Sequence, residues 1–297
     1  MRRFLRTESA SGALLVVGAV VALMWANAAP GSYTDVFDES VRRAIDDWLL
    51  PVFFLVVGLE IRRELERPRD AVLPAIAALG GMAVPAVLYV AIGGGRGWAV
   101  PTATDLAFAV GVLSLLGPRI PSQLKVFLLT LAVVDDIGSV VVVGAFVGGG
   151  IHLTVIAAIV GLAVPPRIGA RVEEPLHVLS GYAIVPLFAL ASAGIRLDGG
   201  IDGRVATAVI VARVAGKVAG ITGASWLAVR FGRLALPRDT TWPMLAGVGV
   251  LGGMGFTVAL YVADLSFADA TGAKLGVLVS AAVSGALGAL VLVRATR

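Results

Sequence analysis

Five ionisable side chains lie within long apolar stretches of the sequence: Asp105, Asp135, Asp136, Arg213 and Lys217. Placing one charge near the centre of a membrane-spanning helix costs about 2.5–3.5 kcal/mol on insertion scales. Four or five such charges together cost on the order of 10–15 kcal/mol, comparable to the stability of a typical domain. Charges this costly indicate an ion or proton pathway, and a buried ion pair that serves only assembly is the alternative.

The residues before Asp105 predict that its helix is interrupted. Pro101 lacks an amide donor and disfavours helix in the residue that precedes it, so we expect a break between Val100 and Asp105, next to Thr104. Non-helical backbone at membrane depth is tolerated only where it lines a cavity or is buried in protein. The break is therefore expected to form part of a site.

Asp135 and Asp136 are consecutive residues in the middle of a predicted helix. Consecutive helical side chains point about 100° apart, so the two carboxylates do not share one environment. We expect one of them to face a water-filled funnel and the other to face a neighbouring helix.

The composition explains why these charges stand out. The 297 residues are 58% apolar and 15% charged, with no cysteine, whereas soluble domains carry about 25% charged residues. This excludes an ordinary cytosolic globule, a disordered protein and a disulfide-built secreted module. The sequence therefore predicts an all-α integral membrane protein.

The apolar segments predict about ten transmembrane helices, since a bilayer core about 30 Å thick needs roughly 20 apolar residues per helix. The predicted spans are 10–29, 47–61, 71–92, 100–116, 123–147, 151–166, 176–195, 204–229, 242–265 and 274–293.

The basic residues predict the orientation, because Lys and Arg gather in cytoplasmic loops. Of the 24 Lys and Arg residues, two lie within a span and six fall on one side. Those six are Arg42, Arg43, Arg96, Arg196, Arg204 and Lys274. The rest fall on the side of both termini, which we therefore expect to be cytoplasmic. The basic balance then reflects topology, and no nucleic acid is expected as a partner.

A second interruption is expected in the span 242–265, where Gly252, Gly253 and Gly255 form a flexible stretch. Interrupted helices in corresponding positions of two halves are typical of inverted-repeat transporters with a site at the midplane. We expect one transmembrane domain over residues 1–297, with repeat units 71–147 and 204–293 whose broken helices cross. The remaining helices, 10–29, 47–61, 151–166 and 176–195, would form a scaffold.

Six segments in this order resemble the NhaA-type Na⁺/H⁺ antiporter family. They are FFLVVGLEIRREL, VPTATDLAFAVGVLSLLG, KVFLLTLAVVDDIG, VPLFALASAG, VAGKVAGI and GMGFTVALYVADLSF. The resemblance covers most of the chain. It implies a secondary transporter, not an enzyme, that exchanges protons for Na⁺ or Li⁺ across the bacterial cytoplasmic membrane.

The resemblance also implies roles for individual residues. Asp136 would be the main carboxylate for the proton and the transient cation, and Asp135 its partner, ion-paired with Lys217 in a protonation-dependent way. Thr104 and Asp105 would lie where the broken helices cross. There Asp105 would offset the positive half-helix N-termini, and Lys217 the negative C-termini.

Further properties follow from the same resemblance. An aspartate pair is similar to the electrogenic members, which exchange two protons for one Na⁺. Glu60, Arg63 and Glu64 match the cytoplasmic region linked to the pH response. Transport by competition at one site needs alternating access, with Na⁺ or Li⁺, protons and the lipid bilayer as partners and no cofactor.

The chain also departs from the family pattern of twelve helices. The segment after Phe146 resembles the eighth helix of the family, so helices six and seven are expected to be missing, with Gly148–Gly150 in their place. The loop after the first span lacks the hairpin that joins protomers in the family, which puts a homodimer in doubt. Arg213 lies four residues before Lys217, and either repulsion of Lys217 or pairing with an acid is open for it.

Two alternatives to transport are weighed. A shortened family member could have been retained for sensing or scaffolding, although the intact charges argue against this. An intramembrane aspartyl protease also uses two carboxylates within spans, but its sequence context is missing and Lys217 would disturb the shared proton.

Overall fold

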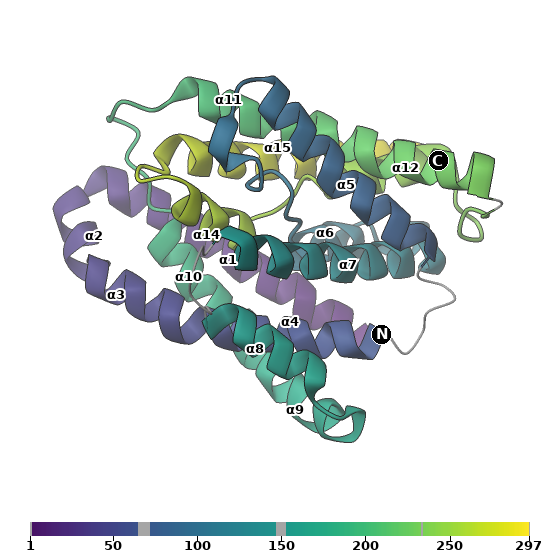
Figure 1. Ribbon diagram of the computed structural model, residues 1–297, viewed down its shortest axis with the longest axis horizontal. Helices are drawn as coiled ribbons and strands as arrows, with labels where there is room; N and C mark the ends of the chain where they lie inside the picture. The colour runs from purple at the N-terminus through teal and green to yellow at the C-terminus, as the bar shows by residue number, and fades with distance from the viewer. Residues whose placement is uncertain (1, 65–71, 147–152, 233, 297) are drawn as a thin grey trace. The chain divides into compact units, whose positions relative to one another are not determined.

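The computed structural model describes residues 2–64, 72–146, 153–232 and 234–296 (Figure 1). Throughout these ranges the regular elements are helices, and no strand occurs in them. This confirms the predicted all-α class. The glycines 148–150 that were expected to replace two helices lie outside the described residues.

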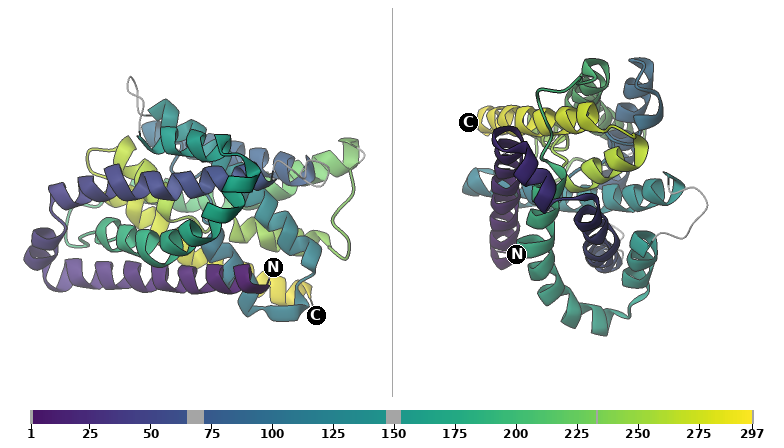
Figure 2. Two further views of the ribbon diagram at one scale, coloured as in Figure 1. Left: turned by 90° about the horizontal axis from the view of Figure 1, so that it is seen from below. Right: turned by 90° about the vertical axis from the view of Figure 1, so that its left-hand side faces the viewer.

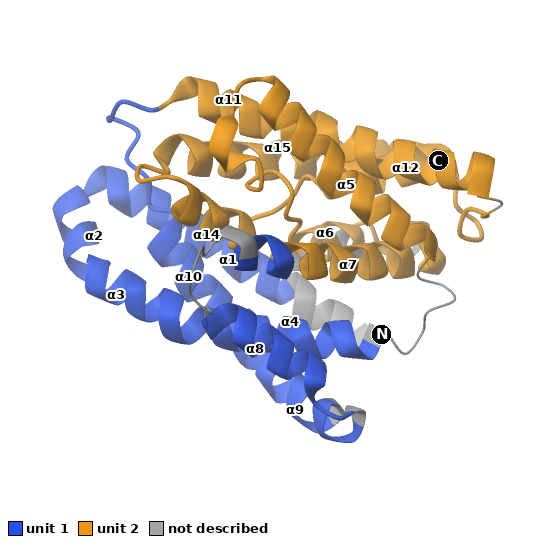
Figure 3. Cartoon of the chain, viewed as in Figure 1, with its two compact units in different colours: residues 1–66, 140–201 blue, residues 67–139, 202–297 orange. Residues whose placement is uncertain are grey.

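The chain forms two compact units, coloured separately in Figure 3. Unit 1 comprises Met1–Glu66 and Val140–Ile201, and unit 2 comprises Arg67–Ser139 and Asp202–Arg297. The helices of unit 1 are α1 (Arg2–Ala28), α2 (Pro30–Val36), α3 (Glu39–Ala44), α4 (Leu50–Glu64), α8 (Leu153–Ala163), α9 (Pro166–Leu179) and α10 (Val185–Ser192). Those of unit 2 are α5 (Val72–Ala91), α6 (Leu106–Leu115), α11 (Gly203–Val211), α12 (Lys217–Gly232), α13 (Trp242–Leu251), α14 (Thr257–Ser266) and α15 (Thr271–Ala295). Most of α7 (Ser122–Phe146) also belongs to unit 2.

Among the described residues, six helices are long and apolar enough to cross a membrane. They are Ala10–Ala28, Val72–Ala91, Ser122–Gly144, Arg171–Ser192, Gly203–Gly232 and Thr271–Ala295. Shorter apolar helices are Leu153–Ala163, Trp242–Leu251 and Thr257–Ser266. Each of the ten predicted spans contains a helix, and the chain is a multi-pass membrane protein.

Three of the helical runs contain a π-helical turn, in which the backbone bonds reach one residue further than in an α-helix. The turn Ala212–Gly216 joins α11 to α12, so that helix runs without a break from Gly203 to Gly232. Another π turn, Ser180–Ile184, joins α9 to α10 in unit 1, and a third, Ile45–Leu49, precedes α4. π turns are frequent at functional positions, and Ala212–Gly216 contains Arg213 and directly precedes Lys217.

Both predicted interruptions are present in unit 2. The span 100–116 is helical only from Leu106, after the non-helical residues 103–105, and the span 242–265 is divided into α13 and α14.

The glycines of the second interruption were expected to form a flexible stretch, but the structure shows them closely packed. Gly252, Gly253 and Gly255 do not have positive φ angles. A Cβ atom at Gly253 would lie 2.4 Å from the Ser284 hydroxyl oxygen, and one at Gly252 would lie 2.7 Å from a side-chain carbon of Ile221. These glycines are therefore closely packed, and a larger residue at either position would require its neighbours to shift.

Closely packed glycines also set the main helix contacts within each unit. In unit 2, α5 runs beside α12 (Figure 1), and Cβ atoms at Gly80 and Gly220 would lie 2.4 and 2.1 Å from each other's carbonyl oxygens. In unit 1, α4 packs on α8, where a Cβ at Gly58 would lie 2.2 Å from the Ala158 carbonyl oxygen. Small residues that let backbones approach are typical of helix interfaces in membranes.

The connection after α1 is helical. The chain continues from α1 through α2 into α3. Helix α1 itself packs on α10 (Figure 2). Asp38 caps α3 by accepting a hydrogen bond from the amide of Val41. These described residues, 30–44, contain no β-hairpin.

Candidate functional site

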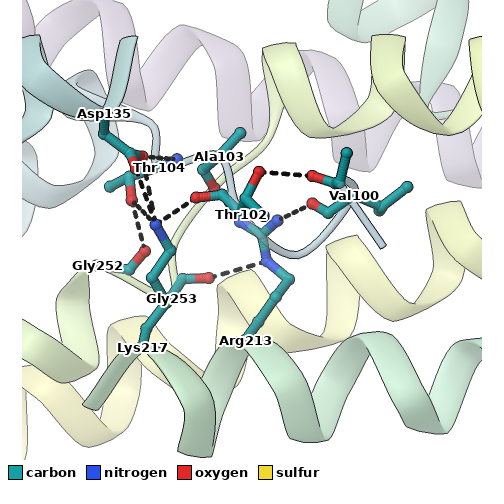
Figure 4. A network of polar contacts seen from close by, with 10 residues as sticks. Val100, Thr102, Ala103, Thr104, Asp135, Arg213, Lys217, Gly252 and Gly253 are labelled. Atoms are coloured by element: carbon teal, nitrogen blue, oxygen red, sulfur yellow. Dashed lines mark hydrogen bonds and ion pairs between the residues drawn. The ribbon is translucent and has the colours of Figure 1, made fainter. Parts of the chain in front are cut away.

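A buried polar network occupies the core of unit 2, where the two interrupted segments meet one face of the α11–α12 helix (Figure 4). Arg213 and Lys217 both extend from this helix toward the residues around Thr102. Asp135 reaches the same place from α7. The network contains three side chains that the sequence singled out for their cost in a membrane.

Lys217 and Asp135 form the ion pair at its centre. The Lys217 ammonium lies 3.3 Å from each oxygen of the Asp135 carboxylate, and their side chains are each only 1% exposed. The ammonium also donates to the carbonyl of Thr102 and, at 2.8 Å, to the hydroxyl of Thr104. All three ammonium protons are thus directed at acceptors.

Thr104 also binds Asp135. Its backbone amide donates to the carboxylate at 2.6 Å, and its hydroxyl donates to the carbonyl of Gly252 at 2.9 Å. Because the residues around Thr104 are not helical, their amides and carbonyls are available for such bonds. The interruption therefore leaves backbone amides and carbonyls free to bind side chains, whereas an intact helix would use them in its own hydrogen bonds.

The two interrupted segments are also bonded directly to each other. The amide of Asp105 donates to the carbonyl of Met254 at 2.8 Å, beside the Thr104–Gly252 bond. Residues about 150 positions apart in the sequence are thereby joined through their backbones, as expected for interrupted helices that cross.

Asp105 lies at the beginning of two half-helices. It directly precedes α6, and its carboxylate accepts hydrogen bonds from the hydroxyl and the amide of Thr257, the first residue of α14, at 3.1 and 3.4 Å. A negative charge at a helix N-terminus is stabilised by the macrodipole and by free amides. Asp105 therefore lies at the N-terminal ends of both α6 and α14.

Arg213 hydrogen-bonds to backbone carbonyls rather than to an acid, one helical turn before Lys217. Its guanidinium is fully buried and donates to three backbone carbonyls, those of Val100 (2.9 Å), Ala103 (3.0 Å) and Gly253 (3.2 Å). These carbonyls belong to both interruptions. Arg213 therefore binds three carbonyls near the half-helix ends whose negative charge Lys217 was expected to offset, and Lys217 itself binds one, that of Thr102.

Asp136 follows Asp135 on α7 but is only partly buried, whereas Asp135 is almost inaccessible. The two neighbours therefore have different surroundings, as their 100° offset on the helix requires. A partly accessible carboxylate beside a buried ion pair is a suitable first contact for a cation.

The three residues predicted to respond to pH belong to unit 1. Glu60 lies 3.4 Å from His177 across α4 and α9, and Arg63 forms an ion pair with Glu173. The side chain of Glu64 lies outside the described residues. Two of the three thus contact side chains of α9, Arg63 in an ion pair and Glu60 beside a histidine.

Sequence reasoning missed Thr257, and it named Gly255 without its contact to Arg213. Thr257 follows the glycine stretch without any distinguishing charge, and its role depends on Asp105, which is distant in sequence. Gly255 is the position where the Arg213 guanidinium packs, since a Cβ there would lie 1.9 Å from a guanidinium nitrogen. The only signal for Arg213 itself was an arginine inside a span, one helical turn before Lys217.

Comparisons with known proteins extend the resemblance to nearly the whole chain. Residues 2–164 and 144–292 match the family described as Na⁺/H⁺ antiporter 1. The Na⁺/H⁺ antiporter NhaA of Paramagnetospirillum magneticum is 37% identical over 369 positions, covering 99% of this chain and 96% of that protein. The NhaA of Vibrio vulnificus is 34% identical over 370 positions, covering 98% and 95%. That of Acidovorax sp. is 38% identical over 375 positions, covering 97% and 90%.

These alignments also show that the chain is shortened internally. Each runs over more positions than the 297 residues of this chain, so the relatives contain residues that it lacks. The two ranges of the family match overlap at residues 144–164, the region where the sequence predicts the loss of two helices.

Proposed function

The chain belongs to the Na⁺/H⁺ antiporter 1 family, and from this premise we propose that it exchanges protons for Na⁺ across the bacterial cytoplasmic membrane. Both termini would be cytoplasmic. The observation that carries the proposal is the buried Asp135–Lys217 pair, held between two interrupted helices and next to Asp136. A membrane protein keeps such a costly arrangement where it serves an ion pathway.

We propose that exchange works by competition at Asp136 and Asp135. A carboxylate in a narrow, desolvated site holds either a proton or a partly dehydrated cation. When Na⁺ or Li⁺ binds, the protons must leave, and when protons bind, the cation must leave. Alternating access of this one site to the two sides then couples the fluxes, with no cofactor beyond the transported ions.

Electrogenic exchange follows from the presence of a second proton-sensitive group. Asp135 is balanced by Lys217, so a cation that binds to both aspartates must displace the ammonium from its partner. Two protonation changes per cation give a stoichiometry of two protons for one Na⁺. Net charge then crosses the membrane in each cycle.

The pH response is proposed to reside at the end of α4, with Glu60, Arg63 and Glu64 as its residues. Support comes from the pairing of Glu60 with His177 and of Arg63 with Glu173, because a histidine pair changes strength within the physiological pH range. His177→Gln should move the pH of half-maximal exchange, and an unchanged profile would exclude this pair from the response.

The proposed function is tested in inside-out vesicles from antiporter-deficient cells, which are energised to a pH gradient and then given NaCl, LiCl or KCl at pH 6.5–8.5. We expect Na⁺ and Li⁺ to dissipate the gradient, and Asp136→Asn to abolish this at equal protein level. Wild-type activity in Asp136→Asn would overturn the site assignment.

A family member that no longer transports remains the second candidate, because the chain lacks residues that its relatives contain. No response to any cation from well-inserted wild-type protein would favour this candidate. The protease alternative is disfavoured, since Asp135 is paired with an ammonium rather than sharing a proton with a second acid.

A further inference from the structure

Arg213 is the fully buried cation that the proposed exchange does not use. Its three hydrogen bonds end on backbone carbonyls of both interrupted segments: Val100 and Ala103 in the first, and Gly253 in the second. A guanidinium offers five donors in a rigid fork and stays charged at every accessible pH. It can therefore bind several carbonyls at once.

One of these carbonyls connects Arg213 to the ion pair. The carbonyl of Ala103 and the amide of Thr104 belong to the same planar peptide unit. The carbonyl accepts from Arg213 at 3.0 Å, while the amide donates to the Asp135 carboxylate at 2.6 Å. Because the unit is planar, fixing its oxygen also fixes the direction of its N–H. Hydrogen bonds in such a chain also polarise one another.

The Arg213 guanidinium packs directly against the backbone at Gly255. Gly255 lies against it, and a Cβ at this position would lie 1.9 Å from a guanidinium nitrogen and 2.3 Å from the Ala103 carbonyl oxygen. Glycine at this position is therefore required by the contact between Arg213 and the peptide unit.

We propose that Arg213 is a positioning residue for Asp135, which it orients through the Ala103–Thr104 peptide unit while joining the two interrupted segments. This inference rests on the proposed function, because it assigns a role to the carboxylate that takes part in exchange. The two buried cations then have different roles. Arg213 binds the carbonyls permanently, and Lys217 is left to change its contact with Asp135 during the cycle.

Three variants test the inference in the full-length protein. Arg213→Lys keeps the positive charge but loses the fork, and Gly255→Ala keeps the arginine but removes its space. Gly223→Ala on the same long helix is the matched control, since nothing lies within 4 Å of a Cβ there.

The first readout is amide hydrogen exchange of the peptide that contains residues 100–105, measured by mass spectrometry in detergent. We expect the Thr104 amide to exchange at least about tenfold faster in Arg213→Lys and Gly255→Ala than in the wild type, because the bond to Asp135 is strained or lost. Gly223→Ala should match the wild type. Unchanged exchange in both variants would overturn the proposal.

The second readout is the dependence of antiport on Na⁺ in proteoliposomes. Both variants should raise the apparent KM for Na⁺ by at least about fivefold, because a displaced carboxylate binds the cation less well. A purely structural arginine would lower the amount of folded protein but leave the KM unchanged. Faster amide exchange with a wild-type KM would therefore overturn the positioning role.

The two readouts separate this inference from the proposed function. If the wild-type protein shows no exchange of any cation, the proposed function fails, and amide exchange alone then decides whether Arg213 positions Asp135. If the wild type transports and the variants keep both its KM and its amide protection, only the inference about Arg213 fails.

Discussion

Arg213 and Lys217, the two fully buried cations among the described residues of unit 2, differ in the partners that they bind. Lys217 faces a carboxylate and a hydroxyl as well as one carbonyl, whereas each bond of Arg213 ends on a carbonyl. Only the first set contains a carboxylate, which can take up a proton. In the proposed mechanism, Lys217 therefore changes its contacts during exchange and Arg213 does not.

Replacing Lys217 by alanine should strongly destabilise the protein. Asp135 would be left buried without its ammonium, and loss of one partner of a buried pair costs about 3–5 kcal/mol of unfolding free energy. The melting temperature in detergent should fall, and the pH profile of exchange should shift.

Lys274→Ala is the matched control for that variant. Lys274 pairs with Asp264 at 2.7 Å, but the Asp264 side chain is 37% exposed, so water replaces the lost partner. We expect a smaller loss of stability and an unchanged pH profile. Equal effects of the two substitutions would remove Lys217 from the mechanism.

The sequence identified Asp105, Asp135 and Lys217 because a charge in an apolar span is conspicuous without any structure. It did not reveal the partners of Arg213. Those partners are backbone carbonyls, which carry no sequence signature, and they come from segments about 110 and 40 residues away. Only the folded crossing brings them to the guanidinium.

At the level of helices, close backbone contact fixes the position of α12 against α5. Gly220 is the residue of α12 that lies against Gly80, with no room for a side chain between them. This contact is near the N-terminal end of α12, one turn from Lys217. Its geometry therefore contributes to the placement of the ion pair.

Gly220→Ala should lower the melting temperature and reduce the amount of folded protein, because its Cβ would lie 2.1 Å from a backbone oxygen that cannot move aside. Overpacking of this kind costs about 1–3 kcal/mol. Gly223→Ala, three residues further on, should be neutral or slightly stabilising, since alanine is the better helix former. Similar melting temperatures for the two variants would contradict the packing described for this interface.

The interruptions show how far local sequence rules reach. Pro101 predicted a break near Val100, and the helix does begin only at Leu106. The glycines of the second interruption predicted where it lies. They did not predict the close packing of Gly253 on Ser284 and of Gly255 on Arg213, because those partners are distant in sequence. Helix ends differ from the predicted spans where π turns extend a helix, as between α9 and α10.

Over the whole molecule, the shortening and the polar network fall in different parts of the chain. The overlap of the two family matches, residues 144–164, lies in unit 1, whereas the network lies in unit 2. Both interruptions and both buried cations are therefore present despite the missing residues. This distribution supports retained transport rather than a degenerate chain.

We expect exchange by this protein to be electrogenic. In proteoliposomes with an imposed Na⁺ gradient, exchange should speed up when valinomycin and K⁺ dissipate the membrane potential, because net charge otherwise accumulates. A rate that does not depend on the potential would indicate exchange of one proton per Na⁺.

The most direct measurement is proton release by the purified protein on addition of Na⁺, followed with a pH indicator in weakly buffered detergent solution. Competition at Asp135 and Asp136 predicts that NaCl or LiCl releases protons, that choline chloride does not, and that Asp136→Asn abolishes the release. Na⁺ binding without proton release from the wild-type protein would contradict competition at these aspartates.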